Sequence, residues 1–407
     1  MWYSDRERTI PEAPMPEQMP GLPRLLVIAC YPPEGGGGGG VIMRSLLKEY
    51  PDESIMWLAL RPDRSKRKKW YRPEVSRWIM PFYVPAKVGR LIGLAAAGRI
   101  EALLERVAVV FAQFAVRKHK PSDILVVADF FTIRSASIII NKFPARRFHL
   151  TVHDDPLITA RMIGSGVNLQ KLEEAFAALC RRAVTVDCVS ARMALKYKTE
   201  YGIQSQIITR CAEDSYLAQL KLKAVRPKSD EINMILCGWG DCPPPWPDNL
   251  MEALRFVRNQ LKVNFHVFDP KFLKYQGCGW VFFHEHMPEI EFDALLAEMD
   301  ISYAPDPFTE EGRRFAAMSL STKVVTSLCA GLPFVYHGPY DSTVGDLVRE
   351  DPLLGLIVES QSPNDLAQGI LAIWENYTAR VAACRTFAQE HYSASVIRRK
   401  FLSRFEH

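Results

Sequence analysis

Short apolar runs separated by stretches with helical spacing constrain this chain more than any other feature of its sequence. A short, uninterrupted apolar run is typical of a parallel strand that helices cover on both faces. Strands that alternate with helices predict a doubly wound parallel sheet. The first half of the chain has such runs at residues 24–30, 54–60, 124–128, 148–152 and 183–186, with a helical stretch at 169–182.

A second series of the same kind begins after a polar segment at residues 221–230, so we place a domain boundary there. The fold class is therefore α/β, with two Rossmann-like, doubly wound parallel-sheet domains. The second series has runs at 232–238, 264–268, 280–283, 301–304 and 334–336, with helices predicted at 248–261, 289–299 and 321–330. The residues from 363 to 405 also have helical spacing. We divide the chain into a proline-rich lead-in at 1–23, an N-terminal domain at 24–225, a C-terminal domain at 226–380 and a C-terminal helix at 381–407, which by analogy with similar architectures packs back on the N-terminal domain.

The composition excludes several classes of protein. The 51 Lys and Arg exceed the 46 Asp and Glu by too little for a dedicated nucleic-acid-binding protein. No apolar run reaches the roughly 18 residues that a membrane-spanning helix needs, and the N-terminus is charged where a signal peptide would be apolar. We therefore expect a cytoplasmic protein. The nine cysteines form no CxxC pair, and the pattern of His284 and His286 lacks a third ligand, so we expect no bound metal and no cofactor.

A run of glycines follows the first predicted strand. In open parallel sheets, ligands bind beyond the carboxyl ends of the strands, so this loop is a candidate site. It begins Glu34, Gly35, Gly36, Gly37, and a helix is predicted to start near Val41. Glycine lets backbone N–H groups approach an anion, and the helix N-terminus favours negative charge. We interpret the loop as an acceptor or phosphate loop; the alternative is a flexible connector, because no P-loop lysine follows.

Three polar residues, His153, Asp154 and Asp155, follow the strand that ends at Val152. A histidine and carboxylates at this edge are suited to binding sugar hydroxyls or acting as a base, so we take all three as catalytic candidates. The structural alternative is that Asp155, which precedes a proline, caps a helix.

A further set of residues in the second half fits an anionic ligand. Thr322 and Lys323 stand at a predicted helix start, after Arg313. Hydroxyls, amides and a lysine in this place are suited to a diphosphate, although a capped helix with a solvated lysine has the same pattern. Gly238, after the first strand of this half, allows close approach of a ligand to the backbone.

A basic segment between residues 61 and 77 is interleaved with aromatic residues. Such segments favour anionic lipid surfaces, at about 1 kcal/mol for each cation, so we expect a membrane surface here. A solvated loop and an RNA contact are the alternatives. The residues we assign to it are Lys66, Arg67, Lys68, Lys69 and Trp70.

Four motifs together resemble the GT-B glycosyltransferases of the large family that includes sucrose synthase and bacterial mannosyltransferases. Residues 31–36 look like the N-terminal loop of that family, and residues 151–154 resemble its mid-sheet "VHD". Residues 300–305 are similar to its "D-v-x-v-x-P" strand, and residues 321–333 to its donor-site helix. The likeness, which spans about residues 25–390, implies a nucleotide-sugar donor in the C-terminal half. It also implies an acceptor in the N-terminal half and sugar transfer, without a metal, in the cleft that the two domains face.

The donor motif departs from the family pattern at two positions. A carboxylate that binds the donor ribose in many relatives is replaced by Thr326, and its partner eight residues earlier by Met318. The resemblance then leaves Lys323, Thr322, Arg313 or Arg210 to bind the diphosphate. It favours a retaining mechanism, in which His153 shapes the sugar site; the alternative is an inverting mechanism, in which Asp154 or Asp155 acts as the base.

The function that we predict is glycosyl transfer from a nucleotide-diphosphate sugar to a lipid-linked saccharide or glycolipid in bacterial surface-polysaccharide assembly, at the inner face of the cell membrane. The alternative is a catalytically silent subunit that binds a partner enzyme. An epimerase on the same architecture would need a second acid/base pair, which the sequence does not single out.

Overall fold

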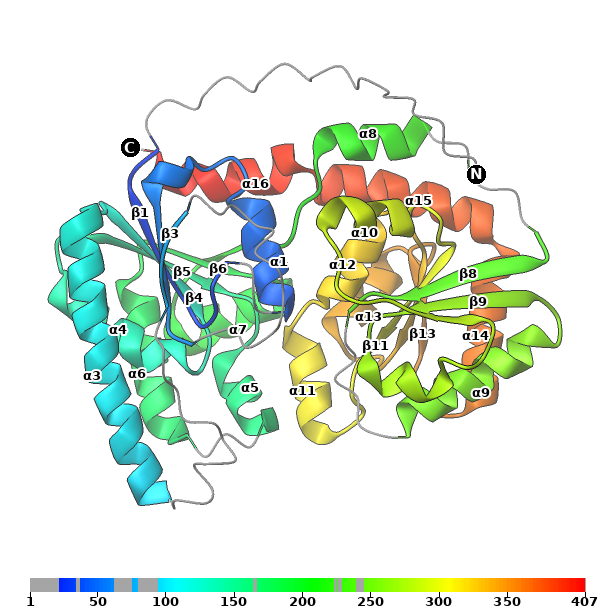
Figure 1. Ribbon diagram of the computed structural model, residues 1–407, viewed down its shortest axis with the longest axis horizontal. Coiled ribbons are helices and arrows are strands. Elements are labelled where there is room, and N and C mark those ends of the chain that lie inside the picture. The colour runs from blue at the N-terminus through cyan, green and yellow to red at the C-terminus, as the bar shows by residue number, and fades with distance from the viewer. Residues whose placement is uncertain are drawn as a thin grey trace, which may run out of the picture.

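The apolar runs form the central strands of two parallel sheets, which lie side by side in the molecule (Figure 1). The computed structural model describes residues 22–33, 37–61, 75–79, 94–163, 167–222, 225, 229–238 and 245–406. Within these residues helices cover both faces of each sheet. The prediction of two Rossmann-like α/β domains is confirmed.

The N-terminal sheet has seven strands in the order β3-β2-β1-β4-β5-β6-β7. Its middle strands are almost wholly buried, as burial under helices on both faces requires. The strands are β1 (Leu25–Ala29), β2 (Ile55–Ala59), β3 (Ser76–Ile79), β4 (Asp123–Ala128), β5 (Arg147–Val152), β6 (Thr185–Cys188) and β7 (Ser205–Ile207). The helices are α1 (Gly37–Leu46), α3 (Leu94–His119), α4 (Thr132–Lys142), α5 (Pro156–Ile163), α6 (Leu169–Arg182), α7 (Ala191–Tyr201) and α8 (Asp214–Leu222), with a 3-10 turn η1 (Asp52–Ser54).

The C-terminal sheet has six strands in the order β10-β9-β8-β11-β12-β13. Its strands are β8 (Glu231–Leu236), β9 (Lys262–Val267), β10 (Val281–Phe283), β11 (Ile301–Pro305), β12 (Phe334–His337) and β13 (Gly355–Val358). Its helices are α9 (Trp246–Arg258), α10 (Glu289–Leu296), α11 (Glu310–Met318), α12 (Thr322–Cys329), α13 (Thr343–Glu350) and α14 (Pro363–Glu375), with the 3-10 turn η2 (Pro270–Tyr275).

Three edge strands, β3, β7 and β13, were not predicted from the sequence. An edge strand has a neighbour on one side only, so it need not be a continuous apolar run. β3 reads Ser-Arg-Trp-Ile and is exposed at both ends, and β7 reads Ser-Gln-Ile. β13 is apolar but only four residues long.

The start of α1 differs from the prediction of a helix beginning near Val41. The helix begins at Gly37, so Gly37–Gly40 form its first turn rather than a loop. Gly37 has a positive φ of 34°, which side chains rarely adopt. The next two glycines lie against side chains from other elements, described below, and this close approach explains a turn of glycine inside a helix.

The end of the chain forms several elements rather than one helix. After α14 come α15 (Tyr377–His391), α16 (Ala394–Leu402) and the 3-10 turn η3 (Ser403–Phe405). α16 contacts α1, and the buried ring of Phe405 meets that of Tyr50 at 5.8 Å between centroids. The chain therefore crosses from the C-terminal domain back to the N-terminal one, as Figure 1 shows along its upper side.

Two buried arginines fix this returning segment to the N-terminal domain. Arg404 forms a buried ion pair with Asp187, with Nη2 2.5 Å from Oδ1. Burial raises the pKa of Asp187, and Arg404 opposes that rise. Arg398, also buried, pairs with Glu49 and Glu213.

Direct contacts also join the two domains. Arg192 on α7 forms a two-pronged ion pair with Asp346 on α13, at 2.5 and 2.8 Å. Ser190 Oγ donates to the carbonyl of Met318 at the end of α11, at 2.5 Å. These bonds hold the N-terminal sheet against the helices that precede and follow the predicted donor helix.

We predict that Arg404→Met lowers the free energy of unfolding by about 3–5 kcal/mol, because it leaves the buried Asp187 carboxylate without its counter-ion. Equilibrium denaturation in urea measures this. Lys262→Met is the control, because its pair with Glu231 is exposed and should change stability by less than about 1 kcal/mol. Equal unfolding midpoints for the two variants would contradict a stabilising role of the buried Arg404–Asp187 pair.

Candidate functional site

The first turns of two helices, α1 and α12, meet where the two domains join. A methyl group placed on Gly38 would lie 2.5 Å from Oγ1 of Thr322, which is the first residue of α12. One placed on Gly39 would lie 2.9 Å from Nδ1 of His153. Side chains larger than glycine do not fit at either position. The first N–H groups of a helix have no partner inside it, so this junction concentrates backbone donors and positive potential.

His153 directly follows β5 and is buried at this junction. Its Nε2 lies 3.4 Å from Oγ1 of Thr151, while its Nδ1 has no hydrogen-bond partner among the described residues. Burial lowers the pKa of His153 to about 4. The imidazole is therefore neutral at pH 7, and its unpartnered nitrogen faces the first turn of α1.

The two aspartates after His153 have different surroundings. Asp155 is fully buried and caps α5: its Oδ1 accepts from the N–H groups of Leu157 and Ile158, both at 3.0 Å. Its Oδ2 accepts from Lys196 Nζ at 2.8 Å. Asp155 therefore has the helix-capping role that the sequence offered as the alternative, and both of its carboxylate oxygens are engaged in hydrogen bonds. Asp154, by contrast, is exposed.

A carboxylate that the sequence analysis missed, Asp129, lies at the same edge of the sheet as His153. Asp129 directly follows β4 as His153 follows β5, and Ala128 pairs with Val152 in the register of these strands. The two side chains therefore leave neighbouring strands at the same edge of the sheet. The signal was present in the sequence, because a carboxylate ended a predicted strand next to the one that carries His153.

The surroundings of Asp129 give it an unusual protonation equilibrium. Burial raises its pKa to about 6, and the charge of Asp154 acts in the same direction. Arg61, which follows β2, and the Phe131 N–H, which donates to Oδ1 at 2.8 Å, oppose the rise. A carboxyl group with a pKa near neutrality is suited to proton transfer or to charge-dependent hydroxyl binding.

The start of α12 has unused donors as well. Ser321 precedes the helix, but its side chain makes no capping hydrogen bond, and its buried Oγ has no partner among the described residues. Thr322 and Lys323 are half-buried, and none of the described carboxylates forms an ion pair with the lysine. An anion at this point would meet helix N–H groups, two hydroxyls and an ammonium.

Arg210 and Thr326 meet across the domain junction. Arg210 Nη1 donates to Oγ1 of Thr326 at 2.5 Å, and both residues are buried. Arg210 and Lys323 both act to lower the pKa of the Cys237 thiol, which burial nevertheless raises to about 12. The two cations therefore lie near the end of β8, one residue before Gly238.

The remaining predicted site residues are either placed elsewhere or not described. Gly238 is exposed and has φ +79°, which favours glycine. Arg313 pairs with Glu359 at 2.6 Å on the surface. The predicted residues that lie outside the described part of the chain are Glu34, Gly35, Gly36, Lys66, Arg67, Lys68, Lys69 and Trp70.

The described residues contain no group of three or more His, Cys, Asp or Glu side chains arranged to hold a metal ion. In the His-x-His pattern, His284 lies against His266 of the neighbouring strand, with 2.9 Å between their ring nitrogens.

Comparison with solved structures supports the architecture over nearly the whole chain. A sucrose-phosphate synthase from Thermosynechococcus elongatus matches with a TM-score of 0.65 and 12% identity, over 94% of this chain and 98% of that one. The Anabaena protein HepE, solved with UDP-glucose, matches with a TM-score of 0.59 and 14% identity, over 93% and 98%. A Listeria monocytogenes protein solved as a candidate UDP-N-acetylglucosamine 2-epimerase matches with a TM-score of 0.58 and 11% identity, over 94% of this chain and 95% of that one.

No family model matches the chain, and no curated protein matches it by sequence. TM-scores of 0.58–0.65 over 93–94% of this chain establish a shared fold, and at 11–14% identity the likeness extends to the fold alone. This chain has two parallel sheets of seven and six strands, and its last helices return to the first domain. This chain therefore has the GT-B fold of the glycosyltransferases that it resembles.

Proposed function

We propose that this chain transfers a sugar from a nucleotide-diphosphate sugar to a hydroxyl acceptor at the junction of its two domains. The observation that carries the proposal is the meeting of the first turns of α1 and α12 around two buried, unpartnered groups, His153 Nδ1 and Ser321 Oγ. Buried polar groups are normally hydrogen-bonded, so two such groups beside two helix N-termini indicate a polar, anionic ligand.

The donor diphosphate would bind at the start of α12. Lys323 supplies a positive charge, and the N–H groups of the first turn and the hydroxyls of Ser321 and Thr322 supply donors. The nucleoside would extend toward Gly238 and the Arg210–Thr326 pair. Positive charge from the protein would stabilise the departing diphosphate without a metal ion.

The acceptor would bind at the carboxyl edge of the N-terminal sheet, where Asp129 and His153 follow neighbouring strands. In the retaining reaction that we favour, the bond from the anomeric carbon to the diphosphate oxygen breaks. The acceptor oxygen bonds to that carbon from the same face, and its proton passes to the departing diphosphate. Neutral His153 would hold a hydroxyl of the transferred sugar, and ionised Asp129 a hydroxyl of the acceptor.

We propose further that the acceptor is a lipid-linked saccharide or glycolipid used in bacterial surface-polysaccharide assembly, and that the chain acts at the inner face of the membrane. The basic, aromatic segment at 61–77 supports this assignment. Among the helices of the described residues, none is long and apolar enough to cross a bilayer.

The silent-subunit alternative is favoured by one contact. Arg210 bonds to Thr326 at the position where many similar enzymes have a ribose-binding carboxylate. A chain that binds no nucleotide sugar would fit this alternative, so donor affinity separates the two.

We predict that the purified chain is stabilised selectively by one member of a panel of UDP-, GDP- and dTDP-sugars, and that Lys323→Met weakens that affinity about ten- to hundredfold. The loss follows from removal of a charge-assisted hydrogen bond, worth about 1.5–3 kcal/mol. Thermal-shift titration measures both effects.

The matched control is Arg255→Met, which removes an exposed cation of α9 in the same domain and should leave donor affinity unchanged. No stabilisation by any nucleotide sugar, from a protein that melts cooperatively, would overturn the transferase proposal in favour of the silent subunit.

The raised pKa of Asp129 predicts a pH dependence. Ionised Asp129 binds the acceptor hydroxyl, so kcat/KM should rise with pH through about 6 and then level off. Asp129→Asn should remove this rise and lower the plateau roughly ten- to hundredfold. Release of nucleoside diphosphate, with a bacterial membrane-lipid extract as acceptor, provides the rate.

The variant His153→Ala distinguishes the role of His153 from that of Asp129. The pKa of His153 is about 4, so the histidine does not titrate between pH 5 and 9. This variant should lose rate at every pH but keep the rise near pH 6. A wild-type profile that is flat from pH 5 to 7 would contradict the role of Asp129.

A further inference from the structure

One face of α3 is exposed and apolar. α3 lies along the outer edge of the N-terminal domain, away from the junction (Figure 1). Leu103 is 60% exposed and Phe114 54%, and Ile100 and Val110 are also exposed. These residues are separated by three, seven and four positions, so they form one stripe along the helix. Contiguous exposed apolar surface of this kind commonly marks a contact with a partner or a membrane.

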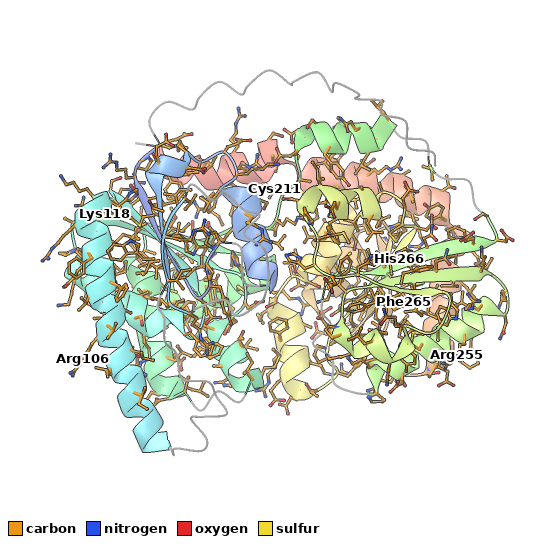
Figure 2. The ribbon with its side chains drawn as sticks, in the orientation of Figure 1. Arg106, Lys118, Cys211, Arg255, Phe265 and His266 are labelled. Atoms are coloured by element: carbon orange, nitrogen blue, oxygen red, sulfur yellow. The ribbon has the colours of Figure 1, made fainter. Side chains whose placement is uncertain are left out.

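Cations lie on the same side of the helix. Arg106, Arg117 and Lys118 are exposed at positions that fall beside the apolar stripe. Figure 2 shows Arg106 and Lys118 pointing outward from the domain. Among the described side chains of α3, the acidic one is Glu105, which pairs with Arg134 of α4 at 3.1 Å. The exposed face therefore combines apolar residues with positive charge.

The adjacent edge strand extends this surface. Trp78 of β3 packs against Phe111 and Phe114, with centroid distances of 5.9 and 6.4 Å. Ile79, the last residue of β3, is exposed. These aromatic contacts pack Phe114 against a strand of the sheet.

The net charge of the N-terminal domain has the same sign as the cations on the exposed face of α3. Residues 24–225 contain 32 Lys and Arg against 18 Asp and Glu, a formal charge of +14. Residues 226–407 contain 17 against 24, a formal charge of −7. The positive half of the molecule is therefore the half that carries α3, and this asymmetry favours an anionic partner.

We propose that the α3 face, defined by Ile100, Leu103, Val110 and Phe114 with Arg106, Arg117 and Lys118, binds an anionic lipid bilayer. Helices with an apolar stripe bordered by cations lie in the plane of such interfaces. A second copy of the chain fits less well, because a twofold interface would bring two copies of the same positively charged face together. The inference rests on the proposed function only in that a lipid-linked acceptor would lie in the same bilayer.

The topology links this face to the site. β3 ends at Ile79 and β4 begins at Asp123, and both are parallel, so α3 runs back along the sheet between them. Its N-terminal end therefore lies toward the carboxyl edge that carries His153 and Asp129. A bilayer along α3 would lie next to the side of the domain where the acceptor is proposed to bind.

Vesicle co-sedimentation tests the proposal without any nucleotide sugar. The full chain is mixed with vesicles of equimolar phosphatidylcholine and phosphatidylglycerol, or of phosphatidylcholine alone. We expect binding to the anionic vesicles that falls with added salt. Arg106→Gln with Lys118→Gln should reduce the partition coefficient about thirtyfold. Leu103→Gln with Val110→Gln and Phe114→Gln should reduce it about a hundredfold or more.

The matched control changes an exposed apolar residue and an exposed cation of the other domain, Ile290→Gln with Arg255→Gln, and should bind like wild type. Unchanged binding by the α3 variants, or no binding of the wild type to anionic vesicles, would overturn the proposal. A change from dimer to monomer in sedimentation velocity without vesicles would instead assign the face to self-association.

Thermal-shift titration of the same variants separates this inference from the transferase proposal. The α3 variants should keep the melting behaviour and donor affinity of the wild type, because the substituted side chains are exposed and are not among the described groups at the junction. Vesicle binding without donor binding would overturn the transferase proposal alone, and donor binding without vesicle binding would overturn the α3 proposal alone.

Discussion

The close approach of α1 to the second domain is the constraint on which the rest of the site depends. Gly38 lies against Thr322 and Gly39 against His153, with no room for a side chain at either position. Only a turn of glycine brings the N–H groups of one helix to the start of another at this distance. The helix loses some stability by containing glycine, and the gain is two converging sets of backbone donors.

That approach requires the two domains to be held in a fixed relation, and the buried ions of the returning chain serve this purpose. Arg404 and Arg398 attach the C-terminal segment to the N-terminal domain, while Arg192 reaches from α7 to Asp346 on α13. Removing one partner of a buried pair costs much more than an exposed pair gains. The same interactions that stabilise the molecule therefore set the distance between Gly38 and Thr322.

The sequence was sufficient for the fold and for part of the site. Strands covered on both faces must be apolar throughout, so β1, β4 and β5 were visible as runs, whereas β3 and β7 were not because edges tolerate polar residues. His153 was found because it follows a predicted strand, and Thr322 because it stands at the start of a predicted helix. The cap formed by Asp155 was one of the two alternatives that the sequence left open. The contact of Asp155 with Lys196 and the raised pKa of Asp129 depend on segments far apart in the chain and on burial, and neither follows from spacing along the chain.

The donor end of the site differs from the acceptor end in its electrostatics. Near Thr326 the buried Arg210 donates a hydrogen bond to the threonine hydroxyl, so the groups there are a cation and a hydroxyl. Near His153 the groups are a neutral imidazole and a carboxyl that ionises close to neutrality. Negative charge on a ligand is thus favoured at the α12 side and hydroxyl groups at the β4–β5 side. Under the proposed function, this polarity would orient a sugar diphosphate with its sugar toward the N-terminal domain, where the acceptor hydroxyl would arrive.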